Sequence, residues 1–197
     1  MKKITAIVAV VLLAVSAFGL AGCSEWLKDP VEDANKAISA ANKSLTKYSD
    51  SDERVQTLAN ELNAIAVSPD GATKALAITG KIRGEFDGQK SALGEARKSI
   101  ASIKALKIKD EFKKYADLEV KAIDARIKII EQGVLLYDEM DKVYTAIRDR
   151  KQNNAQTQQV LAKVDEISGQ IALLTEAART DAQKASDYFM KQQLGGK

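Results

Sequence analysis

Apolar residues recur along most of the chain at spacings of three and four, which is the period of one face of an α-helix. The first segment with this pattern contains Val31, Ala34, Ile38, Ala41, Leu45, Tyr48, Val55, Leu58, Leu62 and Ile65. Asp52 occupies the heptad position between Tyr48 and Val55, and the pattern resumes in phase after it. This preserved phase favours one continuous helix. The alternative is a second helix that starts near Asp50, with Glu53 completing a capping box.

A break at residues 68–71 precedes a second predicted helix, which extends to about Leu106. Ser68 is a suitable N-cap, and Pro69 suits the first helical position because no amide donor is needed there. The predicted inward residues are Ile82, Phe86, Leu93, Ala96, Ile100 and Ile103. Three glycines recur at intervals of four: Gly80, Gly84 and Gly88. Each costs about 1 kcal/mol relative to Ala, so this glycine stripe indicates a close approach of another backbone, a bend, or a weakly specified outward face.

The third predicted helix has the most regular pattern in the chain. A turn at 107–109 precedes it, and Asp110 is its predicted N-cap. Its inward residues are Phe112, Ala116, Val120, Ile123, Ile127, Ile130, Val134, Tyr137, Met140, Tyr144 and Ile147. The polar stretch from Arg150 to Gln159 predicts the last turn and a frayed helix start. The fourth helix then carries Val160, Val164, Ile167, Ile171, Leu174, Ala178, Ala185 and Phe189 on its inward face.

Four helices of about 35 to 40 residues with short connections predict an all-α fold, an elongated up-down-up-down four-helix bundle at residues 31–194. Each helix would be about 55 Å long at about 1.5 Å per residue. The runner-up is a more open arrangement in which the first helix divides near Asp50. In the bundle, the second turn and the C-terminus return to the end at which the first helix begins.

The N-terminal segment differs in composition from the rest of the chain. Lys2 and Lys3 precede an uncharged, mostly apolar run from Ile4 to about Leu20. Such a run after a short positive segment is typical of a secretory signal, and it is too short and wrongly flanked for a spanning helix.

The four residues Leu20-Ala21-Gly22-Cys23 follow, and they resemble the lipobox of bacterial lipoproteins. The resemblance implies cleavage before Cys23, a diacylglyceryl thioether on its sulfur and usually acylation of the new amino group. The alternative is an ordinary signal peptide followed by a free thiol. We therefore expect a signal peptide at 1–22, a lipidated tether at 23–30, and a protein that is anchored in a cell membrane or outer membrane and faces the periplasm or the exterior.

Charge and composition exclude several classes of function. The chain has 30 Lys+Arg and 27 Asp+Glu, and loss of Lys2 and Lys3 with the signal peptide would leave 28 basic and 27 acidic side chains. A near-neutral balance with interspersed signs argues against a nucleic-acid partner. Cys23 is the single cysteine, so the fold must be held by packing without a disulfide if Cys23 is lipidated.

The residues that most enzymes depend on are scarce. The chain has no histidine, the commonest general base and metal ligand, and a lipidated Cys23 is no nucleophile. The motifs of di-iron and haem bundles and of phosphate-binding loops are absent from the sequence. Asp138, Glu139 and Asp141 lack the spacing of a calcium loop. We expect a protein that is not an enzyme, with no cofactor and no metal site.

The main functional hypothesis is a scaffold or interaction module whose partners are the membrane, through Cys23, and an unknown envelope protein or cell-wall component. The alternative is a ligand-binding or sensory bundle, with Tyr137, Tyr144 and the glycine stripe around the ligand. The end of the bundle near the membrane would carry the basic residues Lys28, Lys104, Lys107, Lys109, Lys113, Lys114, Lys184, Lys191 and Lys197, with the aromatic residues Phe112, Tyr115, Tyr188 and Phe189 close by. These lysines either contact anionic headgroups or are ordinary solvated helix ends.

Overall fold

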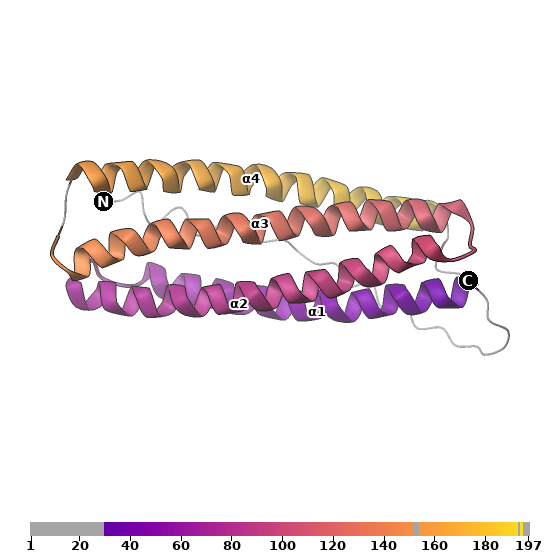
Figure 1. The fold of residues 1–197 in the computed structure, drawn as a ribbon, viewed down its shortest axis with the longest axis horizontal. Helices are drawn as coiled ribbons and strands as arrows, with labels where there is room; N and C mark the ends of the chain where they lie inside the picture. Colours follow the sequence, from indigo (N-terminus) through magenta and orange to yellow (C-terminus); the bar gives the residue numbers. More distant parts are fainter. Residues whose placement is uncertain (1–29, 152–153, 193, 195–197) are drawn as a thin grey trace.

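The computed structural model describes residues 30–151, 154–192 and 194. They form four long helices: α1 (Pro30–Asn63), α2 (Pro69–Ser102), α3 (Asp110–Arg148) and α4 (Asn154–Lys191). A short 3₁₀ turn, Ile103–Ala105, follows α2, and the described part of the chain contains no strand. The predicted all-α, up-down-up-down four-helix bundle is confirmed (Figure 1).

The topology gathers different segments at the two ends of the rod. The start of α1, the turn between α2 and α3, and the end of α4 lie together at the right of Figure 1. We call this end the basal end and define it by residues 30–32, 102–111, 188–192 and 194. The distal end, at residues 64–68 and 149–151, carries the other two connections.

The first helix is continuous, so the alternative break near Asp50 is wrong. α1 runs without interruption through Asp52, whose side chain is buried in the bundle at 6% exposure. The neighbouring Ser51 donates to Glu85 Oε2 of α2 at 2.8 Å, which satisfies a second buried polar group at this level. The apolar residues on both sides of Asp52 therefore keep α1 in register despite the charge.

The helix boundaries follow local chemistry with small departures from the predictions. Ser68 is the N-cap of α2, as predicted, and its Oγ accepts a hydrogen bond from the Gly71 amide at 3.0 Å. Asp110 was predicted as the N-cap of α3 but is its first residue. Its carboxylate there faces the positive end of the helix dipole. The polar stretch from Arg150 to Gln159 was predicted to hold the last turn and the start of the fourth helix, and α4 begins within it, at Asn154.

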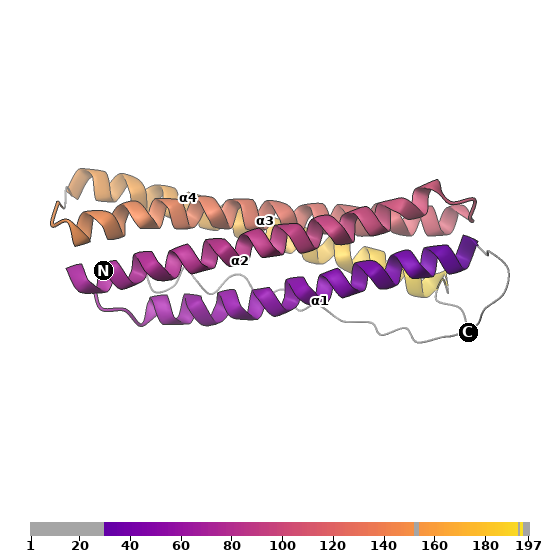
Figure 2. The same ribbon diagram turned by 60° about the horizontal axis from the view of Figure 1, so that its bottom comes forward.

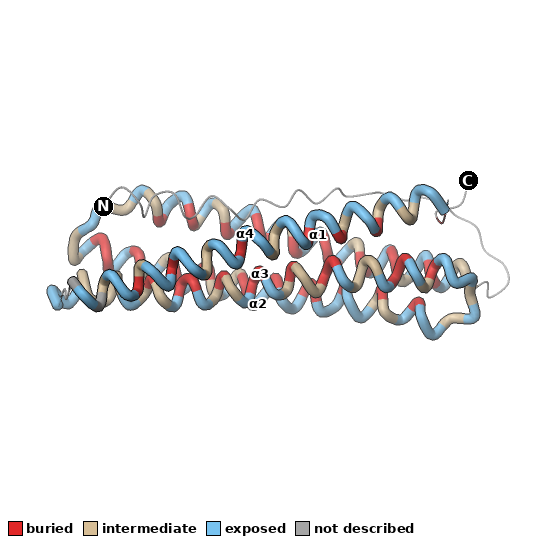
Figure 3. The backbone as a smooth tube through the Cα atoms, turned by 90° about the horizontal axis from the view of Figure 1, so that it is seen from above, coloured by how far each residue is buried: buried red, intermediate tan, exposed pale blue. Residues whose placement is uncertain are grey.

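The core runs the length of the rod along the inward face of every helix (Figure 3). All six inward residues predicted for the second helix are buried, although α2 ends at Ser102 and the last of them, Ile103, lies in the 3₁₀ turn. The inward face of α3 is wider than predicted, because Arg126, Ile129 and Leu136 are buried as well, whereas Ile127 is only half-buried. Helix faces broaden in this way when a helix packs against two neighbours.

Consecutive helices pack side by side, with α2 and α3 each between two neighbours. Ion pairs bridge each of these three helix pairs, for example Arg54–Glu85 between α1 and α2 and Arg83–Asp141 between α2 and α3. The backbones of α1 and α4 approach each other only sparsely, and no ion pair or hydrogen bond of the described residues joins them. The bundle is therefore held along three seams. None of its described helices is long and apolar enough to cross a membrane.

Candidate functional site

The predicted lipidation site, Cys23, lies outside the described residues, together with the predicted signal peptide at 1–22 and the tether up to residue 29. Lys28 and Lys197, predicted for the basal end, also lie outside them. The described chain begins at Pro30, the first residue of α1, at the basal end of the rod.

The described lysines at the basal end divide into paired and unpaired groups. Lys104 contacts Asp117 at 2.7 Å, Lys113 contacts Asp110 at 3.6 Å, and Lys184 contacts Asp181 at 3.7 Å. Lys114 lies over the ring of Tyr188, 5.2 Å from its centroid. Three further exposed lysines form no ion pair within the described chain: Lys107, Lys109 and Lys191.

The four aromatic residues predicted near this end belong mainly to the core. Phe112 and Tyr115 are buried, and the Tyr115 and Phe189 rings pack together with centroids 5.0 Å apart. Burial raises the pKa of Tyr115 above its usual range, and the charge of Glu119 raises it further. These rings therefore close the basal end of the core, and only Tyr188 and Phe189 retain partial exposure.

A buried polar layer crosses the middle of the bundle, and the sequence reveals only its Asp52. Asp52 Oδ2 accepts a hydrogen bond from Gln56 Nε2 at 3.0 Å, whereas Asp52 Oδ1 has no partner at hydrogen-bond distance. Gln89 of α2 is 1% exposed, and its Nε2 likewise has no partner. Burial raises the pKa of Asp52, and the nearby amides of Gln56 and Gln89 oppose that shift.

Arg126 of α3 is a second buried charge of the core. It is 7% exposed, and its Nε has no hydrogen-bond partner. Burial raises the pKa of Glu119, and the charge of Arg126 opposes that shift. Burial also raises the pKa of Tyr48 to about 12, with a further increase from Asp52 and an opposing contribution from Arg126. Arg126 therefore favours the ionised forms of Glu119 and Tyr48, which burial disfavours.

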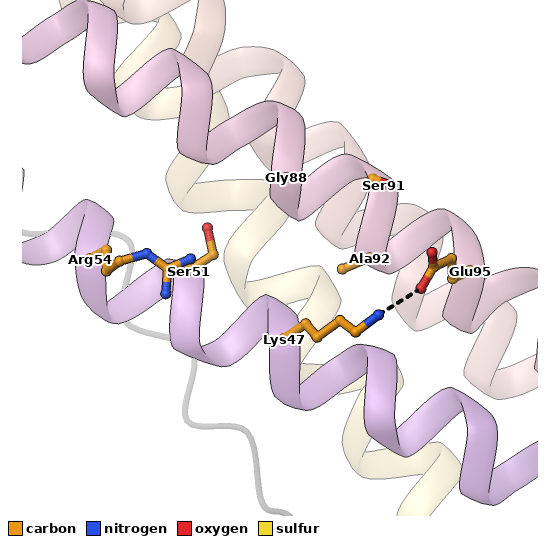
Figure 4. A pocket seen from close by; sticks show the side chains of 7 residues that line it. All are labelled: Lys47, Ser51, Arg54, Gly88, Ser91, Ala92 and Glu95. Atoms are coloured by element: carbon orange, nitrogen blue, oxygen red, sulfur yellow. Dashed lines mark hydrogen bonds and ion pairs between the residues drawn. The ribbon is translucent and has the colours of Figure 1, made fainter.

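One shallow groove of about 270 Å³ lies on the surface between α1 and α2 (Figure 4). Its lining residues are Lys47, Ser51 and Arg54 from α1, and Gly88, Ser91, Ala92 and Glu95 from α2. Lys47 contacts Glu95 at 3.4 Å, and Arg54 contacts Glu85 at 2.9 Å. The Ser44 hydroxyl and, after it, Lys47 lower the pKa of Glu95. The charged side chains that line the groove are therefore already paired within the protein.

The carboxylates of Asp138, Glu139 and Asp141 do not converge on one point. Asp138 and Asp141 both contact Arg83 of α2, at 3.4 and 2.6 Å, while Glu139 contacts Lys142 at 2.6 Å. Asp141 also accepts a hydrogen bond from Thr79 at 2.6 Å. Within the described chain, no three potential ligand residues are grouped to hold a metal ion. These carboxylates instead connect α3 to its neighbours.

The residues of the ligand-binding alternative do not surround a common space. Tyr137 is buried against Phe86, with ring centroids 5.9 Å apart, and Tyr144 is half-buried. The glycine stripe is exposed, and a methyl group on any of its three glycines would meet nothing within 4 Å. It is therefore an outward face. A glycine with a close neighbour is Gly133, where a methyl carbon would lie 2.9 Å from the Phe86 ring.

No protein-family model, curated protein or solved structure matches this chain.

Proposed function

We propose that this protein is a lipid-anchored component of a bacterial cell envelope whose helical rod acts as a scaffold or interaction module without enzymatic activity. The observation that carries the proposal is the Leu20-Ala21-Gly22-Cys23 sequence after a positive and then apolar segment. A cleaved and lipidated Cys23 would leave seven residues, 23–29, before α1 begins at Pro30.

The short tether gives the proposal its geometry. At about 3.5 Å per residue, seven residues span at most about 25 Å. Helices of 34 to 39 residues are about 50 to 60 Å long. A rod anchored at the start of α1 would therefore hold its basal end near the bilayer and can present its distal end to a partner well beyond the headgroups.

Lipidation is tested by metabolic labelling of the full chain with a fatty-acid probe in a bacterial host. We expect label on the wild-type protein and on a Ser24→Ala control, which keeps the cysteine and the residues before it. A Cys23→Ala variant should remain unlabelled and should not be cleaved at this site. Label on Cys23→Ala, or none on the wild type, would refute the anchor.

The scaffold role is tested at the distal end, where Val67 is an exposed apolar residue of the α1–α2 connection. A photo-crosslinking amino acid at position 67 should capture a discrete envelope protein or cell-wall fragment in intact cells. The same amino acid at Leu173, an exposed apolar position in the middle of α4, provides the control away from the distal end. A thermal shift produced by an envelope metabolite, with no crosslinked product, would favour the ligand-binding alternative.

A further inference from the structure

We infer that the turn between α2 and α3 is a second, non-covalent membrane contact, which docks on anionic lipid headgroups and holds the rod upright. The inference rests on the proposed lipid anchor and specifies which surface of the protein meets the bilayer. It is carried by the charges of the turn, by the direction of its side chains, and by the position of the turn relative to the tether.

The charges of the turn lie at the extreme tip of the rod. Lys107 and Lys109 are exposed and lack an ion-pair partner in the described chain, whereas Lys104 is held by Asp117. Lys191 adds a further unpaired lysine from the end of α4. Asp110 and Glu111 follow at the start of α3, and Asp110 contacts Lys113. An anionic bilayer attracts unpaired lysines, and this attraction falls off within a Debye length. Only lysines at the tip of the rod are therefore close enough to be attracted.

The turn directs its apolar and basic side chains differently. Leu106 and Ile108 are half-buried and pack against the core. Leu106 has an extended backbone, with φ −75° and ψ 147°, and successive side chains of an extended segment point to opposite sides. Lys107 and Lys109 accordingly face away from the bundle. The expected contact is electrostatic and lies at the headgroups, without insertion of the turn into the acyl chains.

The tether brings this surface to the membrane. Residues 23–29 end at Pro30, and α1 begins at the same end of the rod as the α2–α3 turn (Figure 2). An anchor within about 25 Å of Pro30 keeps Lys107 and Lys109 close to the lipid without any change in the bundle. Acyl chains alone hold the protein to the bilayer but leave the rod free to tilt, so the lysines determine its orientation.

The test uses the chain from Cys23 onward, which contains all described helices and all described core residues, from Ala34 to Leu194. Its single thiol is coupled to maleimide lipids in vesicles, so that attachment does not depend on cellular lipidation. Amide hydrogen exchange is then measured on vesicles rich in phosphatidylglycerol and on vesicles of phosphatidylcholine alone. We expect residues 103–111 to exchange several-fold more slowly on the anionic vesicles, and the distal connection, 64–68, to be unaffected.

The controls separate this contact from general charge effects. Lys107→Glu with Lys109→Glu should abolish the protection, and so should high salt. Lys74→Glu with Lys81→Glu makes the same change in charge at two exposed, unpaired lysines in the part of α2 nearer the distal end. This variant should keep the protection of residues 103–111. Equal exchange on the two kinds of vesicle, or equal protection of the distal connection, would overturn the inference. Failure of the fatty-acid labelling would instead refute the anchor, so the two failures are distinguishable.

Discussion

Asp52 places a carboxyl group inside the bundle, where only one of its two oxygens has a hydrogen-bond donor. One oxygen accepts from Gln56, the other has no partner, and burial raises the pKa of the group. An ionised carboxylate at such a site is destabilising, because its lost hydration is only partly replaced. It is one of several polar residues buried in the described core, together with Gln89 of α2 and Arg126 of α3.

The pH dependence of stability follows from the direction of this shift. The folded protein holds the Asp52 proton more tightly than the unfolded chain does, so stability decreases as the pH rises from the ordinary aspartate pKa through the raised one. We expect Asp52→Asn to raise the free energy of unfolding at pH 7 by about 1 kcal/mol, and the gain to shrink towards about pH 4. Thermal unfolding followed by circular dichroism checks both.

Glu119 shifts in the same direction, so only the comparison between wild type and variant isolates Asp52. A gain that is the same at every pH would show that the ionisation of Asp52 has no part in it.

Two glycines give a matched pair of substitutions with opposite expected signs. Gly133→Ala places a methyl carbon 2.9 Å from the ring of Phe86, which is buried and cannot withdraw, so we expect a loss of about 1 to 3 kcal/mol. Gly84→Ala meets open space on an exposed helix face and should stabilise the protein by about 1 kcal/mol. Urea unfolding of both variants measures the difference. Stabilisation by both would mean that Phe86 does not pack on Gly133.

At the scale of a whole helix, α3 shows how burial varies along one inward face. It packs against both α2 and α4, and its inward face includes fully buried residues such as Ala122 and Ile123. Ile127, one turn later and equally well placed in the heptad, is only half-buried. Arg126 takes the buried position beside it. We therefore expect isoleucine to contribute more to stability at position 123 than at position 127.

We expect Ile123→Ala to lower the free energy of unfolding by about 3 to 4 kcal/mol, because it leaves a cavity at a site with no exposure. Ile127→Ala should cost about half as much, since solvent already reaches part of that side chain. Chemical denaturation of the two variants compares them directly. Equal losses would contradict the burial described for α3.

For the molecule as a whole, the decisive feature is the unequal packing of its four helices. α2 and α3 each pack against two neighbours, whereas α1 and α4 pack closely against one. The ion pairs along the three close seams are mostly exposed, so each contributes little to stability and mainly favours the correct pairing of helices. Local opening should therefore begin at the outer helices.

Native-state hydrogen exchange tests this directly. We expect the slowest amides in the middle of α2 and α3, near Leu93 and Ile123, and faster exchange through lower-energy opening in α1 and α4. The measurement is made under conditions in which exchange reports the free energy of opening. Equal protection in all four helices would contradict this prediction, because it would mean that α1 and α4 pack closely against each other in solution.

Much of the fold was predictable because it depends on local chemistry. The heptads gave the number, length and order of the helices, and Ser68 with Pro69 marked the start of α2. The predicted N-cap of α3, Asp110, lies one residue after the true N-cap, Lys109. Aspartate is favoured both at the N-cap and in the first turn, so the sequence does not distinguish the two positions. The buried polar residues of the candidate site were predictable only in part. Asp52 stood out in its heptad, but nothing local distinguished Gln89 or Arg126 from solvated residues.

The sequence by itself determined an all-α rod of four antiparallel helices, because apolar spacing and turn residues act within a few positions of one another. It also contains the Leu20-Ala21-Gly22-Cys23 pattern on which the proposed anchor rests. Only the tertiary structure decided which polar residues enter the core, which lysines remain unpaired, and that α1 and α4 share no close seam. Those features depend on the rotation and tilt of whole helices against each other, which no stretch of the chain specifies alone.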